Sequence, residues 1–91
     1  MIVPEKTSLR DNAAMIRQFA ELGPEWFSAV EVSWEVAGAD REGRRRVRLV
    51  IRELARSGTV ERIFARHNSE PLELVRFDRD VLLATLAECK Q

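Results

Sequence analysis

The sequence predicts a mostly helical α+β fold with its elements in the order α-α-α-β-β-α. Apolar residues recur with the 3.6-residue period of a helix in four stretches, 8–22, 28–38, 41–57 and 79–89. Between residues 59 and 77 that period is lost, and β-branched and aromatic residues mix with polar ones, as in a β-hairpin. A chain of 91 residues suits one domain, so we expect a single core within residues 1–91.

The first predicted helix, 8–22, follows an N-terminal arm over residues 1–7 that shows no clear period. Ser8 is the expected N-cap, and Gly23 with Pro24 ends the helix. Its apolar residues form two adjacent stripes, Leu9, Ala13, Ile16 and Ala20 beside Met15, Phe19 and Leu22. The second stripe fits either a deeper core or a subunit interface.

The second predicted helix, 28–38, opens with Ser28 and Glu31, which fit the S-x-x-E capping box, and ends near Gly38. One side of this helix carries Ala29, Val32 and Val36. Trp34 lies on roughly the other side and has no obvious core face. It either fills the core, as most tryptophans do, or contacts a second subunit or a partner protein.

The third predicted helix, 41–57, has an apolar face and an arginine face. The residues expected to be buried are Val47, Val50, Ile51 and Leu54. Asp40 is the expected N-cap, and Gly58 is the expected helix-ending glycine. The opposite side carries the arginine stripe, which consists of Arg41, Arg45, Arg48, Arg52 and Arg56. Because these guanidinium groups repel one another, the stripe is either a merely solvated face or a site for an anionic partner.

The predicted hairpin has strands at 59–66 and 72–77, joined by a loop longer than two residues that contains Asn68, Ser69 and Pro71. Asp78 is the expected N-cap of the last helix, 79–89. The apolar residues of that helix, Val81, Leu82, Leu83, Leu86 and Ala87, cover more of its circumference than one contact needs. We therefore expect the first and last helices to form a homodimer interface.

The formal net charge of zero conceals a basic segment within an acidic chain. Residues 1–40 carry seven acidic and three basic side chains, a net charge of −4. Residues 41–56 carry seven arginines and two glutamates, a net charge of +5, and residues 57–91 have a net charge of −1. A basic helix on an otherwise acidic body is the charge distribution that oriented docking on phosphate groups requires.

Several functional classes are not expected from this sequence. It has no glycine-rich phosphate loop and no nucleophile placed with a histidine in any motif, so we do not expect an enzyme. Cys89 is the only cysteine and His67 the only histidine, so we expect neither a metal site nor any cofactor. No apolar run approaches a membrane span, and we expect a cytoplasmic protein.

The run from residue 28 to about residue 77 resembles a winged helix-turn-helix domain of the bacterial MarR-like and ArsR-like regulators. The spacing that carries the resemblance is that of Val47, Ile51, Leu54, Gly58 and Val60. The resemblance implies that Arg44, Arg45 and Arg48 reach base edges and that residues 66–70 form the wing. The chain departs from the family in a slightly long turn at 38–43, in Glu70 near the wing tip, and in lacking the ArsR-type metal motif.

The arginine stripe suggests roles for single residues, because an α-helix fits the major groove and arginine can bind guanine O6 and N7 there. Arg45 and Arg48 are the candidate base readers. Leu49 beside them either touches a thymine methyl group or is an ordinary exposed leucine. The residues expected to meet phosphates are Arg52, Arg56 and Arg66. His67 is either a further contact or an inert loop residue.

We therefore predict a sequence-specific protein that binds duplex DNA, a small bacterial or phage-type transcription regulator with its third helix in the major groove. The alternative is a winged-helix module for protein interaction, such as an adaptor, an inhibitor or an accessory protein of a mobile element. It would bind an acidic protein partner through the arginine stripe, or a partner through Trp34 and Leu49.

Overall fold

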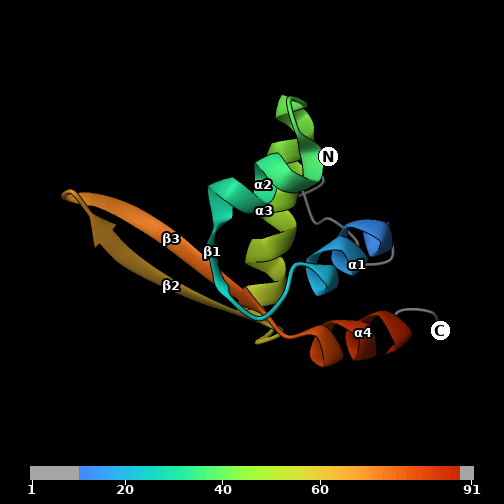
Figure 1. Cartoon of the computed structure of the whole chain (residues 1–91). Coiled ribbons are helices and arrows are strands. Elements are labelled where there is room, and N and C mark those ends of the chain that lie inside the picture. Colours follow the sequence, from blue (N-terminus) through green and yellow to red (C-terminus); the bar gives the residue numbers. More distant parts are fainter. Residues whose placement is uncertain (1–10, 89–91) are drawn as a thin grey trace, which may run out of the picture.

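The computed structural model describes residues 11–88, which form four helices and a three-stranded antiparallel sheet (Figure 1). In chain order the elements are α1 (Ala13–Glu21), β1 (Trp26–Ser28), α2 (Ala29–Ala37), α3 (Arg41–Arg56), β2 (Val60–His67), β3 (Glu70–Phe77) and α4 (Arg79–Glu88). The predicted α+β class is confirmed, and each predicted helix and hairpin strand is present. The predicted order was wrong in one respect, because it omitted β1.

Strand β1 joins the sheet at its outer edge, so that the strand order is β1-β3-β2. Trp26 pairs with Arg76 and Ser28 with Leu74, both in β3. A strand of three residues is too short to show a period in the sequence, and its pairing partners lie almost fifty residues away in the chain. This pairing anchors the start of α2 to the sheet.

Helix α1 is shorter than predicted, because Asp11 and Asn12 form a turn instead of a helix. Asn12 takes the N-cap position with φ −114° and ψ 20°, and its side chain makes no cap hydrogen bond to the described helix. The Asn12 carbonyl accepts a hydrogen bond from the Ile16 N–H at 3.0 Å. The predicted cap Ser8 and the predicted arm 1–7 lie outside the described residues.

Helix α2 begins and ends as predicted. The Ser28 Oγ accepts a hydrogen bond from the Glu31 N–H at 3.0 Å, which is one half of the capping box. At the other end Gly38 has φ +58° and ψ −134°, a conformation that favours glycine, and its N–H donates to the Trp34 carbonyl at 2.8 Å.

Helix α3 buries the four predicted residues, Val47, Val50, Ile51 and Leu54. Gly58 follows its end with φ +82°, and its N–H donates to the Ala55 carbonyl at 3.1 Å. The Thr59 N–H donates to the Leu54 carbonyl at 2.8 Å, which completes a Schellman motif. Asp40 holds the N-cap position, but its side chain accepts no cap hydrogen bond from the described first turn of α3.

The hairpin is longer and its turn tighter than predicted. Strands β2 and β3 pair from Val60 with Phe77 to His67 with Glu70, so only Asn68 and Ser69 remain in the turn. Both have positive φ, 53° and 67°, as a two-residue hairpin turn of type I′ requires. Pro71 was predicted in the loop but lies within β3. Strand β1 does not extend to this part of β3, so one edge of the strand is free there, and the missing N–H of proline breaks no hydrogen bond to β1.

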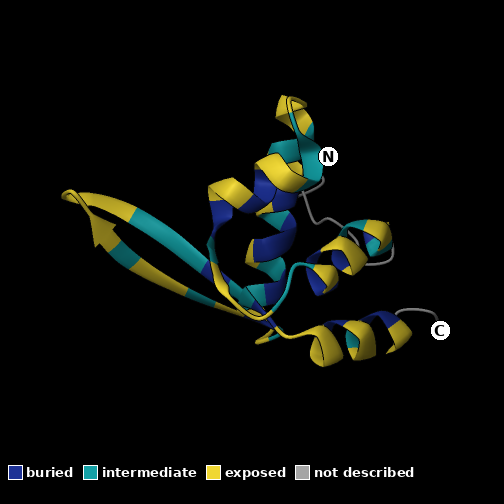
Figure 2. Cartoon of the chain, in the orientation of Figure 1, coloured by how far each residue is buried: buried dark blue, intermediate teal, exposed yellow. Residues whose placement is uncertain are grey.

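The core lies between the helices and the base of the hairpin, while the far part of the hairpin is exposed (Figure 2). Phe19 of α1 stacks on Phe77 of β3 with ring centroids 4.8 Å apart. Met15 and Leu22, which belong to the second stripe of α1, pack against this core. The second stripe is therefore explained by a deeper core.

Helices α1 and α4 pack against each other within the chain (Figure 1). The Asp78 Oδ1 caps α4 by accepting from the N–H groups of Asp80 and Val81, at 3.0 and 3.2 Å. The predicted last residue, Cys89, lies outside the described residues. A homodimer through α1 and α4 stays a prediction, and the large exposed apolar side chains of α4 available to it are Val81 and Leu83. No helix within residues 11–88 is long and apolar enough to cross a membrane.

Candidate nucleic-acid interface

The arginine stripe occupies the exposed side of α3, and all five of its arginines are exposed. This placement follows from the fold, because burial of the apolar face fixes the rotation of the helix. Arg41, Arg48 and Arg52 make no ion pair with any described residue, and Arg45 has an interaction within the chain. Arg56 lies 3.7 Å from the Glu53 carboxylate, an exposed i,i+3 pair that is worth little.

A groove runs along this side of α3. It is lined by Arg41, Glu42, Arg44, Arg45, Arg48, Leu49 and Arg52. Leu49 is half-buried among these side chains, so it is neither a core residue nor a fully exposed one. Six of the seven lining residues are charged and five of the six are arginines, so the groove suits a polyanion with a small apolar group at Leu49.

Arg44 stands apart from the stripe because it bridges two helices. Its guanidinium lies 3.9 Å from the ring centroid of Trp34, and its Nη1 donates to the Gly38 carbonyl at 2.8 Å. Trp34 is 53% exposed and is therefore not a core residue. The structure thus places Arg44 against α2, while Arg45 and Arg48 remain on the open side of α3.

The basic surface continues from α3 onto the hairpin, where the sequence predicts a contact at Arg66 but not at Arg62 or Phe64. A second groove is lined by Arg52, Ala55, Arg56, Val60, Arg62 and Phe64. Arg62 forms an ion pair with Glu73 on β3, and its guanidinium lies 4.6 Å from the ring centroid of Phe64. The available signal was the period of two along β2, which puts Arg62, Phe64 and Arg66 on one face.

The two predicted contact residues near the turn lie on opposite faces of β2. Arg66 and His67 are both exposed, and they pair with Pro71 and Glu70. Arg66 shares its face with Phe64, so it belongs to the surface that continues from α3. His67 points to the other face and is not brought together with the stripe.

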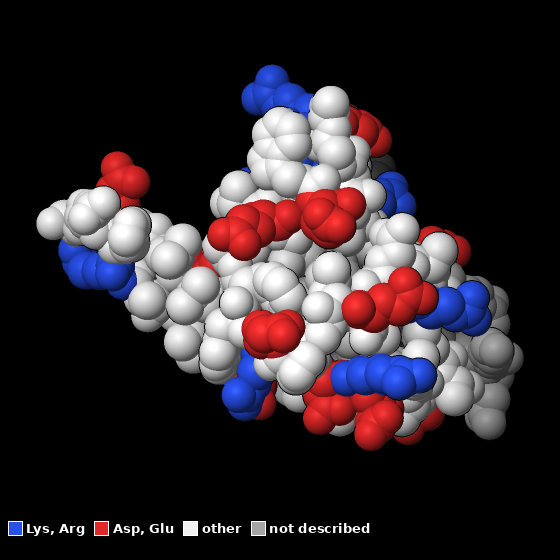
Figure 3. All heavy atoms as spheres, in the orientation of Figure 1, with Lys and Arg blue, Asp and Glu red and all other residues white. Residues whose placement is uncertain are grey.

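The face of the molecule seen in Figure 3 is acidic over α2, unlike the basic exposed side of α3. Acidic side chains lie over α2, on which Glu31 and Glu35 are exposed. The neighbouring apolar side chains Val30 and Trp34, one helical turn apart, are more than half exposed. The molecule therefore presents an acidic and apolar surface on α2 beside a basic one on α3.

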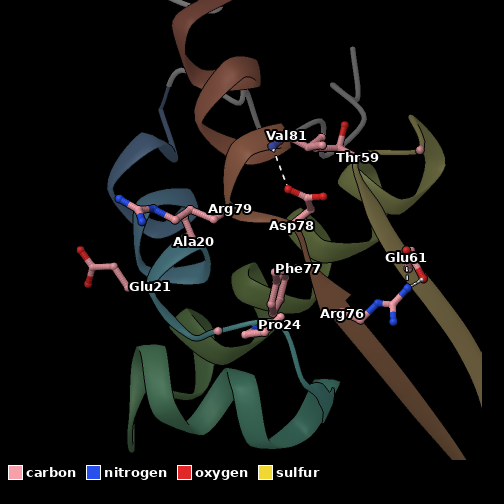
Figure 4. Close-up of a pocket in the computed structure, with 12 residues that line it drawn as sticks. Ala20, Glu21, Pro24, Thr59, Glu61, Arg76, Phe77, Asp78, Arg79 and Val81 are labelled. Atoms are coloured by element: carbon pink, nitrogen blue, oxygen red, sulfur yellow. Dashed lines mark hydrogen bonds and ion pairs between the residues drawn. The ribbon is translucent and has the colours of Figure 1, made fainter.

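A third hollow lies where α1 ends and α4 begins, beside the base of the hairpin (Figure 4). Phe77, Pro24 and Ala20 form its apolar part. The Arg76 guanidinium donates to both carboxylate oxygens of Glu61, at 2.8 and 2.6 Å, and Asp78 is occupied in capping α4. The hollow is lined by three carboxylates, Glu21, Glu61 and Asp78, and by only two arginines, so it has no excess positive charge for a polyanion and is not part of the candidate interface.

Comparison of the chain with protein-family models, with curated proteins and with solved structures gave no match. Within residues 11–88, no group of three or more histidine, cysteine, aspartate or glutamate side chains gathers where a metal could bind. The candidate interface is therefore described by its own geometry, which is a row of guanidinium groups from Arg41 at the start of α3 to Arg62 in the first half of β2.

Proposed function

We propose that the chain is a winged helix-turn-helix protein that binds duplex DNA, with α3 as the recognition helix and the β2–β3 hairpin as the wing. The element order supports this, since α2 and α3 pack against each other and the hairpin follows α3 directly. The observation that carries the proposal is the continuous row of arginines over both elements. Phosphate contacts from such a row would supply affinity and set the orientation on the duplex.

The position of each arginine on α3 or β2 indicates which part of the DNA it would contact. Arg45 and Arg48 lie on the open side of α3 in its first half and would reach base edges in the major groove. Arg52 and Arg56 lie in the second half, next to the hairpin, and would meet phosphates together with Arg66. Arg44 would orient α2 against α3 through Trp34. In this role the protein needs no cofactor and catalyses no reaction, and it would serve as a small cytoplasmic transcription regulator.

The assignment of Arg45 and Arg48 to base edges is tested by measuring the preference of the chain for one DNA sequence over others. Duplexes selected from a random pool by the wild-type chain should compete better than random DNA, and the double variant Arg45→Ala with Arg48→Ala should lose that advantage. Each good bidentate arginine contact discriminates by about 1–3 kcal/mol. Arg46→Ala is the control for loss of one charge on α3, since Arg46 is exposed but lies about 100° round the helix from Arg45.

If the double variant keeps its selectivity, and its circular dichroism spectrum is that of the folded chain, the assignment of α3 as the recognition helix is contradicted. An equal loss of sequence selectivity in the Arg46→Ala control would indicate that the charge of α3 determines selectivity, whichever arginine carries it. Both outcomes can be read from one competition experiment with the same labelled duplex.

A second function is favoured by the surface of α2. Val30 and Trp34 are exposed there together, and buried aromatic anchors are common at the centres of protein interfaces. A protein-interaction module would use Trp34 for a partner protein, or the arginine stripe for an acidic one. We rank this second, because Val30 and Trp34 are two exposed side chains of one short helix, whereas the arginine row extends over both α3 and β2.

A further inference from the structure

Phe64 is the most exposed of the large apolar side chains on the described surface, at 65%. It lies in the middle of β2, on the strand face that continues the basic surface of α3. Exposing an aromatic ring to water forgoes the stabilisation that burial would give. The ring at this position therefore needs an explanation that the phosphate contacts of the neighbouring arginines do not supply.

The surroundings of Phe64 are cationic on several sides. The Arg62 guanidinium lies 4.6 Å from the ring centroid, and Arg52 and Arg56 from α3 line the same groove. Arg66 lies two residues further along the same strand face. The nearest acidic group, Glu73, pairs with Phe64 across the ladder and forms an ion pair with Arg62, so the excess positive charge beside the ring comes from Arg52, Arg56 and Arg66. An aromatic ring among guanidinium groups is the arrangement that holds a nucleotide by its base and its phosphate together.

Within a continuous duplex the base faces are already stacked on each other, so a side chain that stays in a groove meets only base edges. An unpaired nucleotide differs, because its base presents a free π-face that can stack on an aromatic ring whatever the sequence. Ile63, the neighbour of Phe64, is 46% exposed on the opposite face of β2 and does not line either basic groove. The cationic surroundings thus distinguish Phe64 from an ordinary exposed apolar residue.

We propose that Phe64, with Arg62 and Arg66, forms a stacking site for an unpaired base next to duplex DNA. The chain would then bind a duplex that carries a short single-stranded gap more tightly than a continuous duplex of the same sequence. This inference rests on the proposed function, because α3 must first place the hairpin against DNA.

The test compares three labelled duplexes of one sequence and length at one salt concentration. The first is continuous, the second has a gap that leaves nucleotides of one strand unpaired, and the third has the same gap with abasic sites opposite it. The abasic probe keeps the phosphates of the unpaired strand and removes only the bases. The wild-type chain should bind the gapped duplex about tenfold more tightly than either other probe, as base stacking on an aromatic side chain predicts.

Variants at two adjacent positions assign the effect to the ring. Phe64→Ala should abolish the preference for the gapped duplex and leave affinity for the continuous one within about twofold, since phosphate contacts are kept. Phe64→Trp should retain the preference, because any large aromatic ring can stack. Ile63→Ala is the control on the opposite strand face and should bind all three probes like the wild type.

The possible failures are distinguishable. Equal binding of the gapped and continuous duplexes by the wild type would overturn the stacking site and leave the proposed function intact. The same conclusion would follow if Phe64→Ala kept the preference, or if the abasic gap were bound as tightly as the gap with bases. Absence of binding to all three probes would contradict the proposed function and the stacking site together.

Discussion

Gly58 shows how one residue sets the geometry of the interface. It lies between the last turn of α3 and the first residue pair of the hairpin, with φ +82°. Its two neighbouring hydrogen bonds, from Gly58 to Ala55 and from Thr59 to Leu54, turn the chain from helix to strand. Gly58 therefore determines how Arg62 and Phe64 are placed relative to Arg56.

Gly58→Ala should lower the free energy of unfolding by about 1–2 kcal/mol, because a Cβ atom disfavours the left-handed backbone region. Apart from its chain neighbours, a Cβ at this position would have no heavy atom within 4 Å, so the loss should come from the backbone alone. Urea denaturation followed by circular dichroism measures it. Gly58→Asn is the control and should lose less unfolding free energy than Gly58→Ala, since asparagine tolerates this backbone conformation better than alanine. Equal stability of wild type and Gly58→Ala would contradict this explanation.

Individual residues were predictable from the sequence where helical period decides burial. Val47 and Leu54 are buried as expected because one face of α3 is apolar and the other is charged. Trp34 and Arg44 were not predictable as a pair, since their contact joins two helices and depends on how those helices pack. Phe64 was missed because an alternating strand does not reveal which of its faces meets the body.

At the scale of elements, the sequence predicted all the helices and both hairpin strands, with errors at their ends. The predicted turn is too long because proline commonly forms loops, whereas the free edge of β3 tolerates Pro71 within a strand. Strand β1 was missed because its pairing with β3 is a tertiary contact. Consequently α3 could be assigned from the sequence, whereas the joint surface of α3 and β2 required the structure.

Arg52 and Arg56 line the groove where α3 meets β2, and we expect them to contribute to the salt dependence of DNA binding. Arg52→Ala and Arg56→Ala should each lower the slope of log K against log salt by about one unit, because each removes one phosphate contact. Sequence preference should not change. Arg79→Ala on α4 is the control, since Arg79 is exposed but lines the hollow outside the interface. An unchanged slope in both variants, or an equal change in the control, would contradict the assignment of these residues to phosphates.

At the scale of the whole molecule, charge is segregated although the chain is neutral. The segment 41–56 has a net charge of +5, whereas residues 1–40 have a net charge of −4, and in the structure Glu31 and Glu35 are exposed on α2. Such a distribution would orient the molecule, since the basic side is attracted to a polyanion and the acidic side is repelled. It also predicts weaker overall attraction to DNA than a uniformly basic protein would show.

The central claim is that the arginine row of α3 and β2 docks on duplex DNA. The measurement that tests it most directly is the affinity of the wild-type chain for a random duplex as a function of salt concentration. If a monomer neutralises about four phosphates, the slope of log K against log salt should be near −3.6, and affinity should fall by about a hundredfold between about 50 mM and about 200 mM salt. A homodimer with both rows engaged would show about twice that slope. Undetectable binding at about 50 mM salt, or an affinity that does not change with salt, would contradict the claim and favour the protein-interaction module.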